Sequence, residues 1–316
     1  MKKLIIENTY RSLLIYMLYD PRWKERDYIL IRGRISDEFI DRIKSKVNEV
    51  QVRDDFPVIS IKALLSTIYS RLAFLRKISK YDEVYGNVYE LKLRKAKQKL
   101  VLIDDGLMTK KVLSGGYKFN ISHLAFRNNL MFRLLFNVNY KTDNSLFYFL
   151  IPESYKMDSN QNSCEFFNIN KAINNLSNQD YQEICEVFGF IPSKLKGKSV
   201  LMLQPFFEDC LVSSIDYEIN IYKHILDTEG VTEEDIYIKP HPRSNINYNK
   251  YFKKAEFIPK DFPYELLVRE SNDNKFKKVM SVHSSGLDAF IPIAEEVVSF
   301  GTSEFSELEF FPMNRN

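Results

Sequence analysis

The chain has 316 residues, 45% of them hydrophobic and 14% aromatic, and its 45 basic and 42 acidic residues leave a formal net charge of +3. This length suits two domains of ordinary size or one large domain, and the apolar content is enough for folded cores. The balanced charge excludes a dedicated nucleic-acid binder, which carries a strong basic excess. Three widely spaced cysteines without a CxxC pattern argue against a disulfide framework and against a zinc site.

The N-terminus only superficially resembles a signal peptide. Lys2 and Lys3 precede a short apolar run, but Glu7, Asn8 and Arg11 interrupt it, and no small-residue cleavage site follows. No stretch approaches the roughly 18 apolar residues that a membrane span needs. We therefore expect a cytoplasmic protein.

Strands and helices alternate along the first half of the chain. Apolar runs predict strands over residues 4–6, 28–32, 58–61, 84–87, 99–103 and 147–151. Helices are expected over residues 12–19, 36–47 and 62–79, the first of them capped by Asn8 or Thr9 and closed by Pro21. This alternation predicts βαβ units and a mostly parallel sheet.

The same pattern restarts in the second half. Residues 152–178 are polar and read as a linker with a short helix, and a further helix is expected over residues 181–190. Later strands are predicted at 199–203, 235–238, 278–282 and 296–300, with helices at 218–228, near 265–269 and from 287. We therefore predict an α/β fold with two Rossmann-like domains, residues 1–194 and 195–316.

The run Lys239-Pro240-His241-Pro242-Arg243 directly follows a predicted strand. Because proline fixes its own φ and disfavours helix for the residue before it, the imidazole of His241 sits on a stiff backbone. Ligands of open α/β sheets lie outside the carboxyl ends of the strands, where this histidine would project. Lys239 and Arg243 add two cations, so an anionic ligand, phosphate first, is expected near them. A proline-rich turn with a solvated histidine is the alternative.

Two carboxylates and a glycine, Asp104-Asp105-Gly106, follow the predicted strand 99–103. Where the strand breaks at Gly106, one carboxylate can face a cleft and act as a general base on a hydroxyl. A turn or capping pair and a divalent-metal site are the alternatives. The metal is the least favoured, because no further acid converges on the pair.

Ser284-Ser285-Gly286 lies between a predicted strand and an apolar helix. Two hydroxyls and the N–H groups of a helix N-terminus form an anion site, although ordinary helix capping would use the same residues. In the run Pro263-Tyr264-Glu265, the proline fixes the approach to a helix whose first turn carries Glu265. This acid can cap the turn or accept from ligand hydroxyls such as those of a ribose.

Taken in order, these motifs resemble those of the bacterial sialyltransferases, which share a D/E-D/E-G motif, an HP motif and a serine-rich motif. Within that group the chain is most similar to the lipooligosaccharide and capsule sialyltransferases, as in glycosyltransferase family 52. Asn8-Thr9 after the first strand and the run Leu203-Gln204-Pro205-Phe206 add to the resemblance. It implies a GT-B fold, in which two Rossmann-like domains with mostly parallel sheets face an interdomain cleft.

The resemblance also implies residue roles. Asp105 would be the general base that activates the acceptor hydroxyl, and Asp104 would support or orient it, with the choice between the two left open. His241 would hydrogen-bond the departing phosphate, as general acid or as charge stabiliser. The residues implied to bind the donor are Ser284 and Ser285, which would hold the phosphate, Glu265, which would bind the ribose of CMP, and Pro242 of the HP motif.

The implied activity is that of an inverting, metal-independent sialyltransferase that needs no cofactor. It would move sialic acid from CMP-sialic acid to a terminal sugar, by analogy galactose, of a bacterial capsular polysaccharide or lipooligosaccharide. The alternatives are a GT-B transferase for another CMP-sugar, Kdo or another nonulosonate, and a non-catalytic nucleotide-sugar-binding protein. Residues 110–140, rich in Arg, Asn and Phe, could face a lipid-linked acceptor at the cytoplasmic membrane surface, or form a solvated face. A homodimer is left open, and no nucleic-acid partner is expected.

Overall fold

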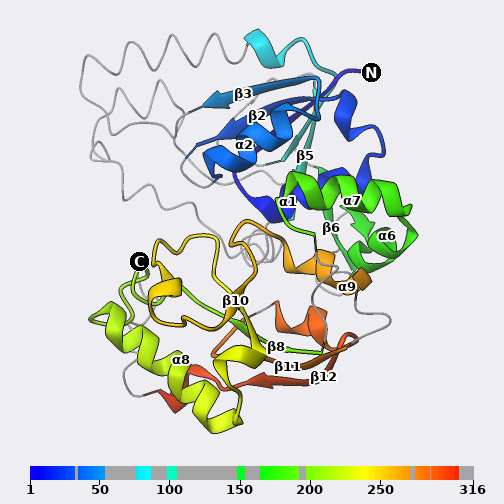
Figure 1. Cartoon of the computed structure of the whole chain (residues 1–316). Coiled ribbons are helices and arrows are strands. Elements are labelled where there is room, and N and C mark those ends of the chain that lie inside the picture. Colours follow the sequence, from blue (N-terminus) through cyan, green and yellow to red (C-terminus); the bar gives the residue numbers. More distant parts are fainter. Residues whose placement is uncertain are drawn as a thin grey trace, which may run out of the picture. The chain divides into compact units, whose positions relative to one another are not determined.

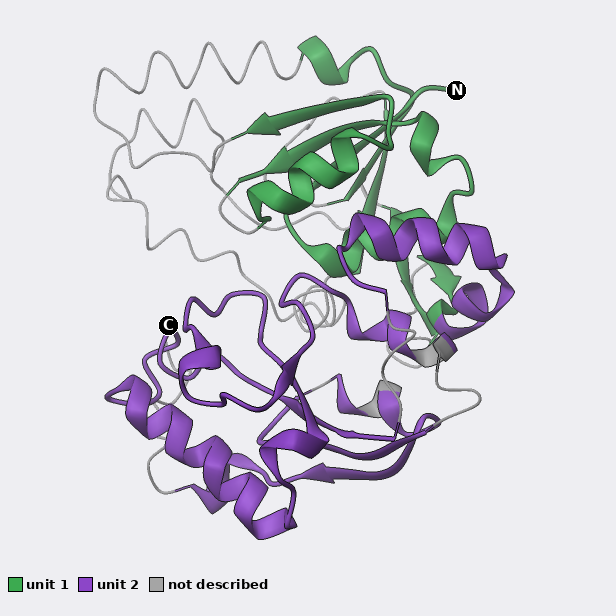
Figure 2. Ribbon diagram, in the orientation of Figure 1, with its two compact units in different colours: residues 1–169 green, residues 170–316 purple. Residues whose placement is uncertain are grey.

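The structure is a computed structural model, which describes residues 1–32, 35–53, 76–86, 98–104, 148–153, 164–191, 197–270, 275–284 and 286–305. Its contacts divide the chain into two compact units, residues 1–169 and 170–316 (Figure 2). The first unit therefore ends earlier than the boundary at 194/195 that the sequence predicted, which itself lies outside the described residues. One reason for the earlier end is a contact of the helix Asn178–Val187, which precedes the predicted boundary. The hydroxyl of Tyr181 in this helix donates to the Leu266 carbonyl over 2.8 Å, and this bond ties the helix to the rest of the second unit.

The first unit is built on a seven-stranded sheet with the order β3-β2-β1-β4-β5-β6-β7, in which neighbouring strands run parallel. The strands are β1 (Lys3–Glu7), β2 (Asp27–Ile31), β3 (Glu49–Arg53), β4 (Glu83–Gly86), β5 (Lys99–Ile103), β6 (Tyr148–Pro152) and β7 (Cys164–Phe167). Its described helices are α1 (Tyr10–Tyr19), the 3-10 turn η1 (Trp23–Glu25) and α2 (Asp37–Lys44).

Two strands of this sheet were missed by the sequence analysis. Residues 49–53 alternate Val50 and Val52 with charged or polar side chains, and this weak pattern belongs to the edge strand β3. The opposite edge strand β7 lies inside the stretch that was predicted to be a linker, so that part of the prediction is wrong. The predicted strand 58–61 and most of the predicted helix 62–79 lie outside the described residues.

The second unit repeats the same arrangement with five parallel strands in the order β10-β9-β8-β11-β12. The strands are β8 (Ser199–Met202), β9 (Ile236–Lys239), β10 (Glu256–Phe257), β11 (Phe276–Ser281) and β12 (Ala294–Ser299). The helices are α6 (Ile169–Asn175), α7 (Asn178–Val187), α8 (Ile215–Glu229) and α9 (Leu267–Glu270), with the 3-10 turns η6 (Glu233–Asp235), η7 (Tyr248–Lys250), η8 (Tyr264–Leu266), η9 (Leu287–Phe290) and η10 (Thr302–Glu304).

Helix α8 covers one face of this sheet (Figure 1). Ser214 caps its N-terminus by accepting the Tyr217 N–H, and Gly230 ends it with a φ of 62°. The apolar side of α8 packs on buried strand residues such as Leu201, Ile238 and Met280. Helix α1 of the first unit is buried nearly all round, as predicted, and Thr9 accepts the Ser12 N–H at its start.

In both units the strand order reverses beside the first strand, between β1 and β4 and between β8 and β11. This is the topological switch point of a doubly wound sheet, where ligands bind beyond the carboxyl ends of the strands. Two Rossmann-like units with parallel sheets confirm the predicted α/β, GT-B class.

Candidate active site

His241 lies in the loop after β9, residues 240–245, which we call the HP loop. The Nδ1 atom of His241 accepts the Arg243 N–H over 3.1 Å, and the His241 carbonyl accepts the Ser244 N–H over 3.0 Å. With Nδ1 used as an acceptor, the proton of a neutral imidazole is on Nε2. Burial lowers the pKa of His241 to about 4, helped by the positive charges of Arg243 and Lys239. The ring is therefore neutral at pH 7 and offers one N–H donor.

The two cations of this motif have other partners. Lys239 is buried, and its ammonium donates to the carbonyls of Pro240, at 3.0 Å, and Lys260, at 2.9 Å. Burial lowers the pKa of Lys239 to about 7, although the negative charges of Asp261 and Glu265 act to raise it. The Arg243 guanidinium forms two hydrogen bonds with Asp209, of 2.6 and 2.9 Å. Both side chains thus hold loops together, and the geometry gives no support to their prediction as phosphate ligands.

Glu265 is buried in the 3-10 turn η8, which starts after Pro263 as the sequence indicated. The Leu266 N–H donates to the Pro263 carbonyl over 3.2 Å, so the proline does set the entry into this turn. The charge of Glu265 acts on Lys239, which directly precedes the HP loop. The structure therefore brings Glu265 to the same edge of the sheet as His241.

Ser284 follows β11, and its Oγ accepts the Gly286 N–H over 3.1 Å. Ser285 lies outside the described residues. The helix expected after this motif is the four-residue 3-10 turn η9, so the helix-dipole part of the predicted anion site is wrong, and the serine hydroxyl remains. Gly286 packs directly on Tyr264, because a Cβ on the glycine would lie 2.8 Å from the tyrosine Cζ. The serine motif and the Glu265 turn are thus in contact.

Asp104 directly follows β5 in the first unit and is fully buried. Its Oδ2 accepts two hydrogen bonds of 3.2 Å from the Nε and Nη2 atoms of Arg11, and its carbonyl accepts the Ser12 hydroxyl over 3.0 Å. The charge of Asp104 is thereby compensated, which fits the supporting role rather than that of the base. Asp105 lies outside the described residues. Sequence reasoning missed Arg11 as a partner, although it is the single charged residue of helix α1.

Two acids that the sequence analysis overlooked, Glu208 and Asp209, lie in the loop after β8. Asp209 binds Arg243, and Oε1 of Glu208 accepts from the Ser244 hydroxyl at 2.8 Å and the Asn245 N–H at 2.6 Å. Their position beyond a strand end, like that of Asp104 and Asp105, is the signal that could have identified them.

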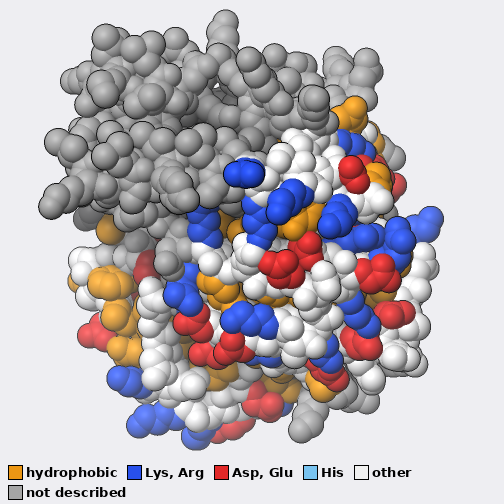
Figure 3. Space-filling view, turned by 90° about the horizontal axis from the view of Figure 1, so that it is seen from above, with side chains coloured by type: hydrophobic (Ala, Val, Ile, Leu, Met, Phe, Trp, Pro, Cys, Tyr) orange, Lys and Arg blue, Asp and Glu red, His pale blue; other side chains and the backbone are white. Residues whose placement is uncertain are grey.

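One face of the described part of the chain is mixed in charge. Basic and acidic side chains are interspersed on the face seen in Figure 3. Within the described ranges, no three or more His, Cys, Asp or Glu side chains are grouped to hold a metal ion. No helix in the part that the structure describes is long and apolar enough to cross a membrane.

A histidine, a glutamate and a serine thus lie beyond the strand ends of one of two Rossmann-like units of GT-B type. Residues 37–288 match the model of the alpha-2,8-polysialyltransferase family, and the chain belongs to this family. The prediction of a bacterial sialyltransferase is confirmed at this level, and the finer likeness to family 52 stays a prediction.

An uncharacterized protein of Haemophilus influenzae is 27% identical over 149 residues, which is 46% of this chain and 46% of that protein. The UDP-GlcNAc 2-epimerase of Methanocaldococcus jannaschii is similar in structure, with 11% identity, a TM-score of 0.45 and coverage of 100% of this chain and 94% of the epimerase. A Staphylococcus aureus MnaA–UDP complex gives 14% identity, a TM-score of 0.48 and coverage of 96% and 80%.

Proposed function

We propose that this protein is an inverting sialyltransferase that moves sialic acid from CMP-sialic acid to a sugar hydroxyl. The family match carries the proposal. The gathering of His241, Glu265 and Ser284 beyond the strands of the second unit supports this unit as the donor-binding one.

His241 acts in this proposal on the leaving group. As the bond from the anomeric carbon to the phosphate oxygen of CMP breaks, its electron pair goes to that oxygen. The anomeric carbon of sialic acid is tertiary, so the transition state is oxocarbenium-like and negative charge collects on the phosphate. Donors aimed at developing charge contribute most to catalysis. The neutral imidazole with its Nε2–H favours charge stabilisation over general acid catalysis for His241. Ser284 and Ser285 would add hydroxyl donors, and Glu265 would hold the ribose.

The acceptor oxygen attacks from the opposite face, which inverts the anomeric carbon and needs no covalent intermediate. Asp105 takes the acceptor proton, and Asp104, held by Arg11, supports it. No metal ion takes part in this scheme. The use of CMP-sialic acid over Kdo or another nonulosonate donor is part of the proposal.

The acceptor is proposed as the terminal sugar of a bacterial surface glycan, met at the cytoplasmic face of the membrane. Galactose was expected from the motif resemblance. The description of the matched family as alpha-2,8-polysialyltransferases favours a second candidate, a terminal sialic acid.

The test is release of CMP from CMP-sialic acid in EDTA, with galactose-terminated, sialic-acid-terminated or no acceptor. Acceptor-stimulated release that survives EDTA is the expected result. The His241→Ala variant should lose about 10³-fold in kcat, as expected for a lost oxyanion donor, with an unchanged melting temperature. Release with CMP-Kdo alone would move the proposal to that donor, and failure of CMP to bind would overturn it.

A further inference from the structure

The HP loop is held from both sides by side chains of neighbouring loops. On one side, Asp209 takes the Arg243 guanidinium, and Glu208 takes the Ser244 hydroxyl and the Asn245 N–H. On the other side, the Lys260 ammonium donates to the Ser244 carbonyl over 3.2 Å. Carboxylates that accept from backbone and from a guanidinium make strong, directional hydrogen bonds. The backbone of this loop is therefore fixed by contacts outside itself.

The loop that carries the two acids is itself anchored to buried residues of α8. The Tyr222 hydroxyl donates to the Gln204 carbonyl over 2.6 Å and accepts the Gln204 N–H over 2.7 Å. Oε2 of Glu218 accepts the Phe207 N–H over 2.7 Å. Because Tyr222 and Glu218 are fully buried, Glu208 and Asp209 are presented from a rigid support.

The position of the Arg243 N–H decides the orientation of His241. That N–H is the donor to Nδ1, so its placement selects which nitrogen of the ring carries the proton and where Nε2 points. Arg243 is placed in turn by the two hydrogen bonds of its side chain to Asp209. A side chain 32 positions before the histidine in the sequence thus bears on the ring through Arg243, in addition to its charge, which acts to raise the pKa of His241.

We propose that Glu208 and Asp209 are positioning residues of the transfer reaction, which hold the HP loop so that the Nε2–H of His241 faces the donor phosphate. This rests on the proposed function of His241. In this proposal Arg243 supports the ring of His241 and does not bind the donor.

The kinetic test compares Asp209→Asn, Glu208→Gln and Arg243→Gln with the wild type. We expect kcat for CMP release to fall about tenfold in each, with KM for CMP-sialic acid changed less than about twofold, because a small misplacement of a catalytic group costs rate. Asp209→Asn combined with Arg243→Gln should cost little more than either change alone, and Asp209→Glu should restore part of the rate. The matched control is Glu234→Gln, which removes the surface ion pair with Lys254 near the start of β9 and should leave kcat unchanged.

Nitrogen NMR of the His241 ring gives a second readout that needs no activity. The wild type should show the Nε2–H tautomer, and the Asp209 and Glu208 variants should show a mixture of tautomers; spectra of His241→Ala assign the signals. Unchanged kcat with an unchanged tautomer would overturn the proposal, as would a raised KM with unchanged kcat. If the wild type released no CMP, the proposed function would fail, and the tautomer alone would decide whether these acids position the ring. Melting curves show which variants are folded. If an Asp209 or Glu208 variant does not fold, the result for Arg243→Gln decides in its place.

Discussion

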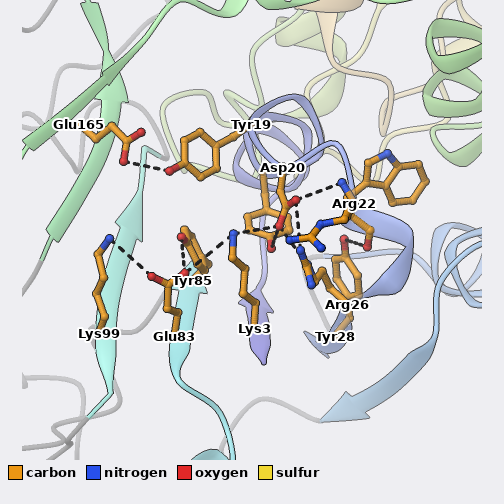
Figure 4. A network of polar contacts seen from close by, with 12 residues as sticks. Lys3, Tyr19, Asp20, Arg22, Arg26, Tyr28, Glu83, Tyr85, Lys99 and Glu165 are labelled. Atoms are coloured by element: carbon orange, nitrogen blue, oxygen red, sulfur yellow. Dashed lines mark hydrogen bonds and ion pairs between the residues drawn. The ribbon is translucent and has the colours of Figure 1, made fainter. Parts of the chain in front are cut away.

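The two units share one strand order over five strands, and a network of charged side chains in each lies at a different end of the strands. In the first unit, a polar network lies where strands begin: Lys3, Glu83 and Lys99 are the first residues of β1, β4 and β5 (Figure 4). Asp20, at the end of α1, accepts from Lys3 at 3.1 Å and from Arg26 at 3.0 Å. Glu83 lies 3.9 Å from the Lys3 ammonium and 3.6 Å from that of Lys99.

In the second unit, the corresponding network lies where strands end. It joins Glu208, Asp209 and Glu218 to the HP loop after β9. Since ligands of doubly wound sheets bind at the carboxyl ends of the strands, this network lies where it can act on a ligand, as does the Arg11–Asp104 pair of the first unit. In the proposed reaction, charges at the carboxyl ends of the strands serve chemistry, whereas the charges where strands begin serve stability. Substitutions within the two networks should therefore affect different properties of the protein.

The largest effect on stability is expected from Asp20→Asn. This change leaves Arg26 buried without its anion and leaves Lys3 with Glu83 alone, and loss of one partner of a buried pair costs about 3 kcal/mol or more. The rate of CMP release per folded molecule should stay the same. Chemical denaturation measures the loss of stability. The matched control Asp41→Asn removes an exposed pair with Lys44 in the same unit and should cost less than about 0.5 kcal/mol.

The pH dependence of this variant follows from the pKa of Asp20. Burial raises that pKa, but the hydrogen bonds from Arg26 and Lys3 outweigh burial and hold it well below its ordinary value. A depressed folded-state pKa gives stability that is present above the unfolded value near 4 and is lost as the pH falls through the folded one. The stabilities of wild type and Asp20→Asn should therefore converge in acid. A constant gap down to pH 2 would contradict this account.

Glu218 should have a smaller effect on stability than Asp20, and its contribution should change with pH in the opposite direction. Burial raises its pKa to about 7, although hydrogen bonds from Tyr248 and the Phe207 N–H oppose the rise. Proton counting agrees: Glu218, Tyr248, Ser244 and Glu208 form a chain with three contacts but only two hydroxyl protons, so a proton on Glu218 would complete it. A raised folded-state pKa gives stability that is fully present below the unfolded value near 4.3 and is lost as the pH rises to about 7.

The wild type should accordingly lose about 3 kcal/mol relative to Glu218→Gln between pH 4 and pH 8. The glutamine amide can donate to Tyr248 and accept from Phe207 as the protonated acid does, so the variant should fold. Subtracting the two stability curves removes the contribution of His241, whose lowered pKa acts in the opposite direction. Parallel curves for the two proteins would show that Glu218 does not change its charge in this range.

The sequence predicted the fold and the motif positions better than it predicted the contacts. Buried strands such as β5 and β9 are continuous apolar runs, and motifs that follow them are easily assigned to the carboxyl edge. Edge strand β3 was missed because one face of it is polar, and β7 was missed because it is short and lies within a polar stretch. The pairs Arg11–Asp104 and Asp209–Arg243 join residues 93 and 34 positions apart, and no local pattern encodes such pairs. Charge alone suggested that Lys239 and Arg243 bind phosphate, and it could not show that Lys239 is buried against two carbonyls or that Arg243 pairs with Asp209.

The smallest effect concerns Cys210, which follows Asp209. Among the described residues it is the one non-glycine with a positive φ, at 57°, so local strain also lies at the carboxyl edge of the second unit. Cys210→Gly should relieve about 1–2 kcal/mol of backbone strain, offset by about 0.5–1 kcal/mol of added freedom in the unfolded chain. The net result should be a gain near 0.5 kcal/mol in denaturation experiments, with unchanged kcat. Cys210→Ala is the control, because it removes the thiol and keeps the Cβ. An equal gain in both variants would mean that the thiol side chain destabilises the wild type and that the backbone at residue 210 is not strained. A fall in kcat for the glycine variant alone would mean that the strained turn helps to hold Asp209 on Arg243.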